Sequence, residues 1–173
     1  CARKCVSEGS SKKNSEKRIS QAHYIIAKVL NQRGVYQEAL SHAREATAFN
    51  PSHAFALDVQ AEALIGLRRF QEAIYASNQA LRLSDGKYST MHFRLGSAYF
   101  DLENWQLAKQ SFEKAAELDV HDDAAAYNVA LCEVRLGCYR DAAIWYEEVL
   151  RRNPNHKEKS DILNSIQVFR LLR

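Results

Sequence analysis

Proline, glycine and long apolar runs are scarce in this sequence. Of its 173 residues, 2 are proline and 6 are glycine, so few positions are forced out of a helix. Ala, Leu, Glu, Gln and Arg are frequent, and these residues favour helices. No run of 18 apolar residues occurs, so we expect no membrane span. Together these features predict an all-α domain of ordinary size.

The common motifs of catalysis are also missing. The sequence contains no glycine-rich phosphate loop, no G-x-S-x-G element and no H-E-x-x-H zinc motif. The six histidines lie in separate segments. Cys132 could form a nucleophilic pair with His92 or His121, but such a pair needs a preformed pocket that stacked helices rarely provide. We therefore expect no enzymatic activity and no cofactor.

Cysteine is too sparse for a disulfide or zinc framework. The four cysteines are Cys1, Cys5, Cys132 and Cys138, and only the first two have the short spacing of a zinc-binding pair. We expect no metal, free thiols and a cytoplasmic location. Because the first residue is Cys rather than Met, we interpret the chain as a fragment or a processed product. Any upstream targeting signal or catalytic domain would then lie outside it.

Positive charge is concentrated at the two ends of the chain. Residues 1–19 and 151–173 each carry six Lys or Arg against two acidic residues, whereas residues 20–150 carry 12 basic and 17 acidic residues. Basic ends can contact nucleic acid or an acidic membrane. We favour solvated flanks, because the charges are not interleaved with aromatic residues as in single-strand binders. Nucleic acid is therefore not an expected partner.

What the sequence does contain is an internal repeat. Four similar strings begin at Tyr36, Phe70, Trp105 and Tyr139, at spacings of 34, 35 and 34 residues. Each has Ala three residues after the aromatic and a small residue seven positions later, and each follows a second amphipathic segment. This pattern predicts four antiparallel helix-turn-helix units, over residues 20–53, 54–88, 89–122 and 123–155.

The repeat resembles that of the tetratricopeptide family, in which W-x₂-L-G-x₂-Y is followed by A-x₃-F, Ala and Pro over 34 residues. The third unit matches best, and the second departs by placing Asp85-Gly86 where the family has Pro. The matching residues of the third unit are Leu95, Gly96, Tyr99, Ala108, Phe112 and Ala115. The resemblance implies a right-handed superhelical solenoid of four repeats over residues 20–155.

Small side chains recur where paired helices must approach closely. We expect these contacts on the first helices at Ala27, Ala61, Gly96 and Ala130, and on the second helices at Ala39, Ala73, Ala108 and Ala142. The aromatic residue that begins each second helix should fill the wedge between hairpins. We also expect turns at Gly34 and Gly137, a positive φ at Gly86, helix ends before Pro51 and Pro154, and an N-cap at Asp122 or Asp123.

The two flanks have different patterns. Residues 1–19 are polar and lack apolar periodicity, so we predict a basic linker or N-terminal flank there. Residues 156–173 place Ile162, Ile166, Phe169 and Leu172 on one stripe. Because the last hairpin cannot bury both of its faces alone, we predict that this segment is a C-terminal capping helix.

The resemblance also implies a function. In the tetratricopeptide family the first helices line a concave groove that commonly holds an extended peptide or a partner's helix. The corresponding residues here are Tyr24, Lys28, Asn31, Phe55, Asp58, Glu62, Phe93, Arg94, Ser97, Phe100, Tyr127, Asn128, Leu131 and Arg135. The aromatic members could anchor apolar side chains, or they could pack within the stack. Arg94, Asn128 and Arg135 could bind a carboxylate or peptide carbonyls.

One subclass of the family binds chaperone tails through a carboxylate clamp of Lys, Asn and Arg. The corresponding positions here hold Tyr24, Lys28, Val59, Thr90 and Arg94, of which only Arg94 fits. The next register begins with Asp58 and Glu62, which would repel a carboxylate. We therefore expect a scaffold for another peptide or partner protein. The alternatives are a self-associating structural protein, or an RNA-associated repeat that uses its basic ends.

Overall fold

The computed structural model describes residues 2–171, with side chains from Lys12 onward, and these residues form nine helices and no strand. The helices are α1 (Ala2–Gln32), α2 (Tyr36–Phe49), α3 (Ala54–Gly66), α4 (Phe70–Leu83), α5 (Ser89–Asp101), α6 (Trp105–Leu118), α7 (Asp123–Leu136), α8 (Tyr139–Arg152) and α9 (Lys159–Leu171). All four second helices begin at the predicted aromatic residues.

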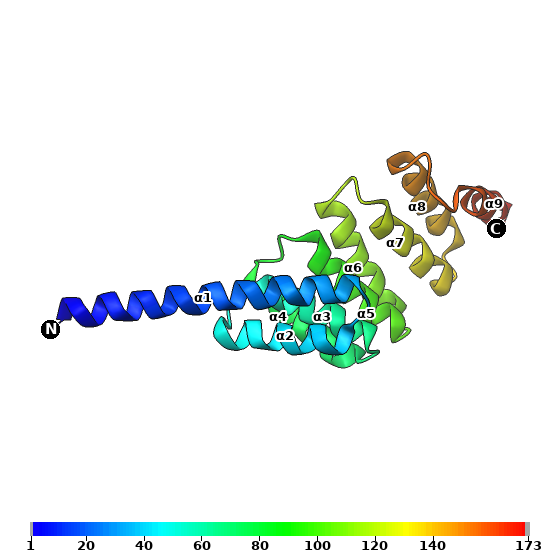
Figure 1. Ribbon diagram of the computed structural model, residues 1–173. Coiled ribbons are helices and arrows are strands. Elements are labelled where there is room, and N and C mark those ends of the chain that lie inside the picture. Colours follow the sequence, from blue (N-terminus) through cyan, green and yellow to red (C-terminus); the bar gives the residue numbers. More distant parts are fainter. Residues whose placement is uncertain (1, 172–173) are drawn as a thin grey trace. The chain divides into compact units, whose positions relative to one another are not determined.

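The helices form two compact units, the first ending at Asp85 and the second beginning at Gly86. Unit 1 contains the hairpins α1–α2 and α3–α4, and α2 also packs on α3. Unit 2 contains the hairpins α5–α6 and α7–α8, with α6 packed on α7 and α9 packed on α8. Within each unit, neighbouring hairpins therefore stack as helical repeats do (Figure 1).

Small residues lie at the helix crossings, as predicted. The seven alanines expected there are fully buried. Gly96 shows why a small residue is required: a Cβ atom at this position would lie 2.8 Å from the ring of Phe112. The Phe112 side chain thus lies directly on the α5 backbone, where it is 1% exposed. This contact brings α5 and α6 together at the centre of their hairpin.

Three of the aromatic residues at the second-helix starts, Tyr36, Trp105 and Tyr139, pack against the next helix of their own unit. The Tyr36 ring lies so close to α3 that a Cβ on Gly66 would be 2.5 Å from it. In unit 2, the Trp105 ring lies 5.7 Å from the Arg135 guanidinium, and the Tyr139 ring lies 5.2 Å from the Phe169 ring of α9. These contacts agree with the predicted wedge, although Tyr139 remains partly exposed.

The turns within the hairpins share one backbone conformation. Gly34 and Gly137 have φ values of 74° and 78°, as their positions predicted, and Gly86 has a φ of 65°. The corresponding turns of the second and third hairpins hold Arg68 and Glu103, with φ values of 59° and 58°. These two residues therefore adopt a left-handed conformation that favours glycine.

The α1 helix extends further than the sequence predicted. Residues 2–19, expected to be a linker, are helical and continue into the first repeat helix without a break (Figure 1). This stretch has no proline and is rich in Lys, Arg and Glu, which favour helices. A helix that is already anchored by packing can propagate through such residues without an apolar stripe. The prediction of a linker therefore misjudged the secondary structure, while the side chains of residues 1–11 lie outside the described part.

The α9 helix covers the last hairpin. Ile162 and Ile166 are buried in a cluster with five residues of α7 and α8, and Phe169 packs against its edge. The α7 and α8 members of this cluster are Ala126, Ala130, Ala143, Tyr146 and Val149. Leu172, predicted for the same stripe, lies outside the described residues. At the other end of this hairpin, Asp122 is the N-cap of α7, because its carboxylate accepts a 2.9 Å hydrogen bond from the amide of Ala124.

Candidate peptide-binding surfaces

Unit 1 brings the predicted residues of α1 and α3 together. The Asn31 amide donates hydrogen bonds to the Val59 carbonyl at 2.9 Å and to the Glu62 carboxylate at 3.1 Å. Asn31 is only 5% exposed, so its amide joins the two helices rather than facing solvent. Asp58 is buried as well, which leaves little of these polar groups at the surface.

The accessible part of this surface is aromatic and basic. Phe55 is 37% exposed, and its ring lies 6.4 Å from that of Tyr24. Lys28 is exposed one turn further along α1. The Tyr24 ring packs in addition against His53, at 5.2 Å between ring centres. Unit 1 can therefore offer an apolar contact beside a positive charge.

His53 was not among the predicted site residues, yet it supports Tyr24. The Ser20 hydroxyl donates its hydrogen to the Ala46 carbonyl at 2.7 Å, so it accepts the 2.9 Å hydrogen bond from His53 Nδ1. Partial burial lowers the pKa of His53 below its ordinary value. The ring is thus held neutral against α1.

In unit 2, two predicted aromatic anchors are largely used for packing. The Phe93 and Phe100 rings lie 5.2 Å and 6.5 Å from the ring of Phe112, and Phe100 also packs edge-on against Trp105 at 4.8 Å. Both residues are half-buried. The sequence left open whether these rings anchor a ligand or pack within the stack. The structure shows that most of their surface packs within the stack.

The remaining predicted residues of unit 2 are spread along α5 and α7. Ser97 donates a hydrogen bond to the Phe93 carbonyl of its own helix at 3.0 Å. Arg94 and Leu131 are half-buried, and Arg135 is exposed over the Trp105 ring. Tyr127 and Asn128 adjoin a defined hollow.

This hollow, of about 600 Å³, lies between the start of α7 and the α8–α9 loop. We call it the α7 hollow. It is lined by Asp123, Ala124, Tyr127, Asn128, Asn153, Asn155, His156 and Lys157. The loop residues were missed from the sequence, because loop positions have no periodicity that would place them beside α7.

Tyr127 is the fixed wall of the α7 hollow. Its ring stacks on His156 at 5.3 Å and contacts Tyr146 at 5.8 Å, and its hydroxyl donates a short hydrogen bond to Glu158. Burial and this hydrogen bond raise the pKa of the Tyr127 hydroxyl, and the same bond lowers the pKa of Glu158. The tyrosine is therefore neutral and held in place at neutral pH.

Polar groups at the rim remain available for a ligand. The Asn128 amide nitrogen bonds the Ala124 carbonyl at 2.8 Å, while the Asn128 side-chain oxygen accepts no hydrogen bond from another described residue. The Asn155 side chain forms no hydrogen bond with the described residues either. Asn153 differs, since its amide donates to Asp123 at 2.6 Å. The rim thus combines amide groups with the highly exposed Lys157, whose ammonium lies 3.6 Å from the Glu158 carboxylate.

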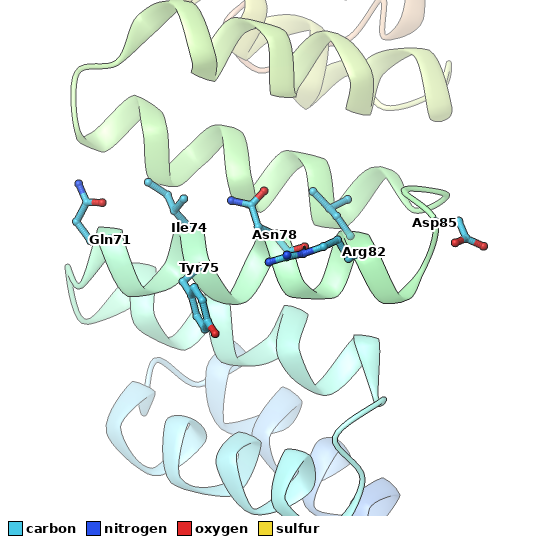
Figure 2. A pocket seen from close by; sticks show the side chains of 7 residues that line it. Gln71, Ile74, Tyr75, Asn78, Arg82 and Asp85 are labelled. Atoms are coloured by element: carbon cyan, nitrogen blue, oxygen red, sulfur yellow. Dashed lines mark hydrogen bonds between the residues drawn. The ribbon is translucent and has the colours of Figure 1, made fainter.

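The second helices carry another hollow that the sequence did not predict. It has a volume of about 680 Å³ and follows one face of α4 (Figure 2). Figure 2 shows Ile74, Asn78 and Arg82 along this helix, with the Tyr75 side chain pointing away from Ile74. Tyr75, which is 63% exposed, also borders a smaller hollow of about 390 Å³ near Pro51. The repeat pattern of the second helices reports the residues that pack between helices, so it did not predict this hollow along α4.

Unit 2 also contains a group of three possible metal ligands and a buried cysteine. The possible ligand atoms of Glu133, Cys138 and Asp141 lie within 4.8 Å of one another. However, the Glu133 carboxylate already forms an ion pair with the Lys109 ammonium at 2.6 Å. Cys132 is fully buried, and burial raises its pKa to about 12. Its thiol is therefore protonated at neutral pH, which disfavours the nucleophilic pair considered from the sequence.

Comparison with known proteins decides the family. A tetratricopeptide repeat model matches residues 59–119 and 93–157, which together span more than half of the chain. The chain belongs to the tetratricopeptide repeat family. Tetratricopeptide repeats generally serve as non-enzymatic modules for protein interaction. No helix within the described part of the chain is long and apolar enough to cross a membrane.

Two curated relatives match part of this tetratricopeptide protein. The DnaJ homolog subfamily C member 7 of Mus musculus is 35% identical over 91 residues, which are 53% of this chain and 18% of that protein. The Homo sapiens protein of the same name matches to the same extent. The chain therefore spans only a small part of these curated relatives.

Solved structures confirm the all-α helical repeat solenoid. MamA has a TM-score of 0.75 at 18% identity, covering 87% of this chain and 80% of that chain. YrrB, described as a tetratricopeptide protein with an unusual peptide-binding site, has a TM-score of 0.73 at 22% identity, covering 96% and 80%. The predicted fold class is thus correct, and the chain is a repeat scaffold of the protein-interaction type.

Proposed function

We propose that this tetratricopeptide scaffold holds an extended peptide segment of a partner protein, with the α7 hollow as its main contact. The observation that carries the proposal is the meeting of Tyr127 and Asn128, both at groove positions of the family, with the amide-rich α8–α9 loop. The peptide-binding property stated for YrrB belongs to that protein, but it is consistent with this role.

The chemistry of the rim suits a peptide backbone. An extended peptide presents an amide donor and a carbonyl acceptor at each residue, and a side-chain amide can pair with both. Asn128 offers a carbonyl oxygen and Asn155 a complete amide, while Lys157 adds a positive charge. A ligand with an acidic side chain near its bound backbone would therefore be preferred.

The hollow is also organised before a ligand arrives. Tyr127 is held by ring contacts to Tyr146 and His156 and by its hydrogen bond to Glu158. A wall that does not need to be ordered on binding loses less conformational entropy. In unit 1, Phe55 and Lys28 provide a second surface that could hold an apolar side chain.

The proposal can be tested with peptides selected from a random displayed library against the whole chain. Their dissociation constants would be measured by fluorescence anisotropy for wild type, Asn128→Ala and Lys157→Ala. We expect Asn128→Ala to weaken binding roughly tenfold, about 1.4 kcal/mol. Asn78→Ala in the α4 hollow is the matched control and should bind as wild type. Unchanged binding by Asn128→Ala, with loss in Asn78→Ala, would move the site to α4.

We further propose that the scaffold does not act as a carboxylate clamp for chaperone tails. Asp58 and Glu62 occupy the base of one possible clamp, and Tyr24 and Val59 occupy two positions of the other. Acidic groups there disfavour a peptide carboxylate. Acidic peptides with a free C-terminus should therefore bind no more tightly than their C-terminal amides in a calorimetric titration, and a clear preference for the free acid would refute this exclusion.

A further inference from the structure

The outward side of α1 carries a row of exposed apolar side chains. Ala22, Ile26 and Val29 follow one another at intervals of four and three residues, so they lie on one stripe of the helix. Val29 is 40% exposed, Ile26 is 43% exposed and the neighbouring Ile25 is 51% exposed. We call this surface the α1 face.

The equivalent positions of other repeats are covered by a preceding helix. Val29 corresponds to Ala63 of α3 and Cys132 of α7, and both of these residues are fully buried. In unit 2 the covering helix is α6, since Val129 and Cys132 of α7 cluster with Ala108 and Phe112 of α6. The α1 face therefore occupies the repeat positions that a preceding helix covers in α3 and α7, but no helix of the described residues covers it.

The residues just before the first repeat do not supply the missing helix. In the other hairpins a turn separates the preceding second helix from the next first helix, as between Phe49 and Ala54 or between Leu118 and Asp123. Residues 2–19 contain no such turn and continue α1 along its own axis (Figure 1). They extend for roughly 27 Å at 1.5 Å per residue, so they cannot fold back over the α1 face.

The charge around the α1 face indicates what could cover it. Arg18 lies on the same stripe, four residues before Ala22, and Arg33 follows the end of α1, four residues after Val29, where its amide still donates a 3.2 Å hydrogen bond to the Val29 carbonyl. No acidic residue occurs from Lys17 to Arg33, and neither Arg18 nor Arg33 forms an ion pair with another described residue. An apolar stripe with arginine at each end is complementary to a helix with acidic flanks.

A second copy of the chain would not match this charge pattern. In an antiparallel pair centred between Ile25 and Ile26, Arg18 of one copy would lie opposite Arg33 of the other. In a parallel pair each arginine would face its own counterpart. Both arrangements place like charges together, which is destabilising.

We propose that the α1 face docks an acidic amphipathic helix of a partner protein, which takes the place of a preceding second helix. Its contact side would carry small and aromatic residues, as α6 does against α7. Its flanks would carry Asp or Glu toward Arg18 and Arg33. This surface is distinct from the α7 hollow and does not depend on it.

A peptide copied from α6, Trp105–Leu118, is a suitable probe, because this helix covers the equivalent surface of α7. An acidic form carries Lys109→Glu and Lys114→Glu, and a basic form carries Glu113→Lys and Glu117→Lys. Binding of both to the full chain would be measured by fluorescence anisotropy at low salt. We expect the acidic form to bind at least tenfold more tightly, and Arg18→Glu/Arg33→Glu to reverse this order.

Two variants locate the interaction on the α1 face. Ile26→Glu/Val29→Glu should weaken binding of the acidic peptide at least tenfold. The matched control is Ile144→Glu on α8, which is 63% exposed and should leave binding unchanged. Circular dichroism would verify that each variant remains helical. Equal affinity for the two peptides, or no saturable binding, would overturn the proposal, and a wild-type dimer that Ile26→Glu/Val29→Glu dissociates would replace it with self-association.

Discussion

At the scale of single residues, the hairpins depend on glycine and alanine at the helix contacts as much as on the larger side chains that pack there. Gly96 allows the Phe112 ring to lie on the α5 backbone, and Gly66 does the same for the Tyr36 ring. The seven buried alanines bring the remaining helix pairs close together. A sequence pattern of small residues can reveal such contacts, because a larger side chain has no space at these positions.

The contact between Gly96 and Phe112 leads to a first prediction. Gly96→Ala adds a methyl group 2.8 Å from a buried ring, so it should destabilise the protein by about 1–2 kcal/mol despite the better helix propensity of alanine. Chemical unfolding would measure the loss. In a Phe112→Leu background the same change should be neutral or stabilising, whereas an equal loss in both backgrounds would contradict the steric explanation.

The left-handed turn residues lead to a second prediction. Glu103 has a φ of 58° at the position that Gly34 and Gly137 occupy in other hairpins. Glu103→Gly should therefore raise the free energy of unfolding by about 1 kcal/mol. Gly137→Ala, the reverse change in an equivalent turn, should lower it by a similar amount. If urea titrations showed that Glu103→Gly lowers the free energy of unfolding or that Gly137→Ala raises it, the turn conformation would not be the cause.

His53 leads to a prediction about pH. Burial lowers its pKa in the folded state below the ordinary value of 6.5, so the unfolded chain binds a proton first as the pH falls. The stabilisation by neutral His53 is complete above pH 6.5 and is lost as the pH falls through the lower folded pKa. Urea unfolding at pH 7.5 and 5.5 should show a smaller pH effect in His53→Gln than in wild type. The exposed control His121→Gln should retain the wild-type effect.

At the scale of elements, sequence reasoning succeeded where packing requires a residue type. The starts of α2, α4, α6 and α8 coincide with the predicted aromatic residues, and the Tyr36, Trp105 and Tyr139 rings pack against the next helix of their own unit. It did not find the helical extension of α1, since a solvated helix needs no apolar period. It also missed Asn155 and His156, which reach the α7 hollow from a loop. It left open whether Phe93 and Phe100 face a ligand or pack within the stack, and in the structure both rings pack against Phe112.

The capping role of α9 leads to a prediction at this scale. Ile162 and Ile166 are the α9 members of a buried cluster with α7 and α8. Ile162→Ala should therefore cost about 2–5 kcal/mol by leaving a cavity. Leu163→Ala on the exposed side of α9 is the control and should cost less than 1 kcal/mol. Hydrogen exchange should show faster opening of α7 and α8 in the first variant, and an effect confined to α9 would argue against a capping role.

At the scale of the whole molecule, the two proposed binding surfaces are formed by different residues. The α7 hollow is polar and suits an extended backbone, whereas the α1 face is apolar and basic and suits a helix. Because different residues form them, a selected peptide in the α7 hollow and the acidic α6-derived peptide should bind simultaneously. The affinity of the first should not change when the second is saturating. Mutual exclusion in this titration would indicate one shared site.

The most direct measurement of the central claim is a nuclear magnetic resonance titration of the labelled chain with a selected peptide. Side-chain amide signals report Asn128, Asn153 and Asn155 individually, and the same spectrum contains Asn78 of the α4 hollow. The account predicts that the Asn128 and Asn155 signals shift in proportion to occupancy while Asn78 stays in place. Shifts at Asn78 with the α7 signals unmoved would contradict it.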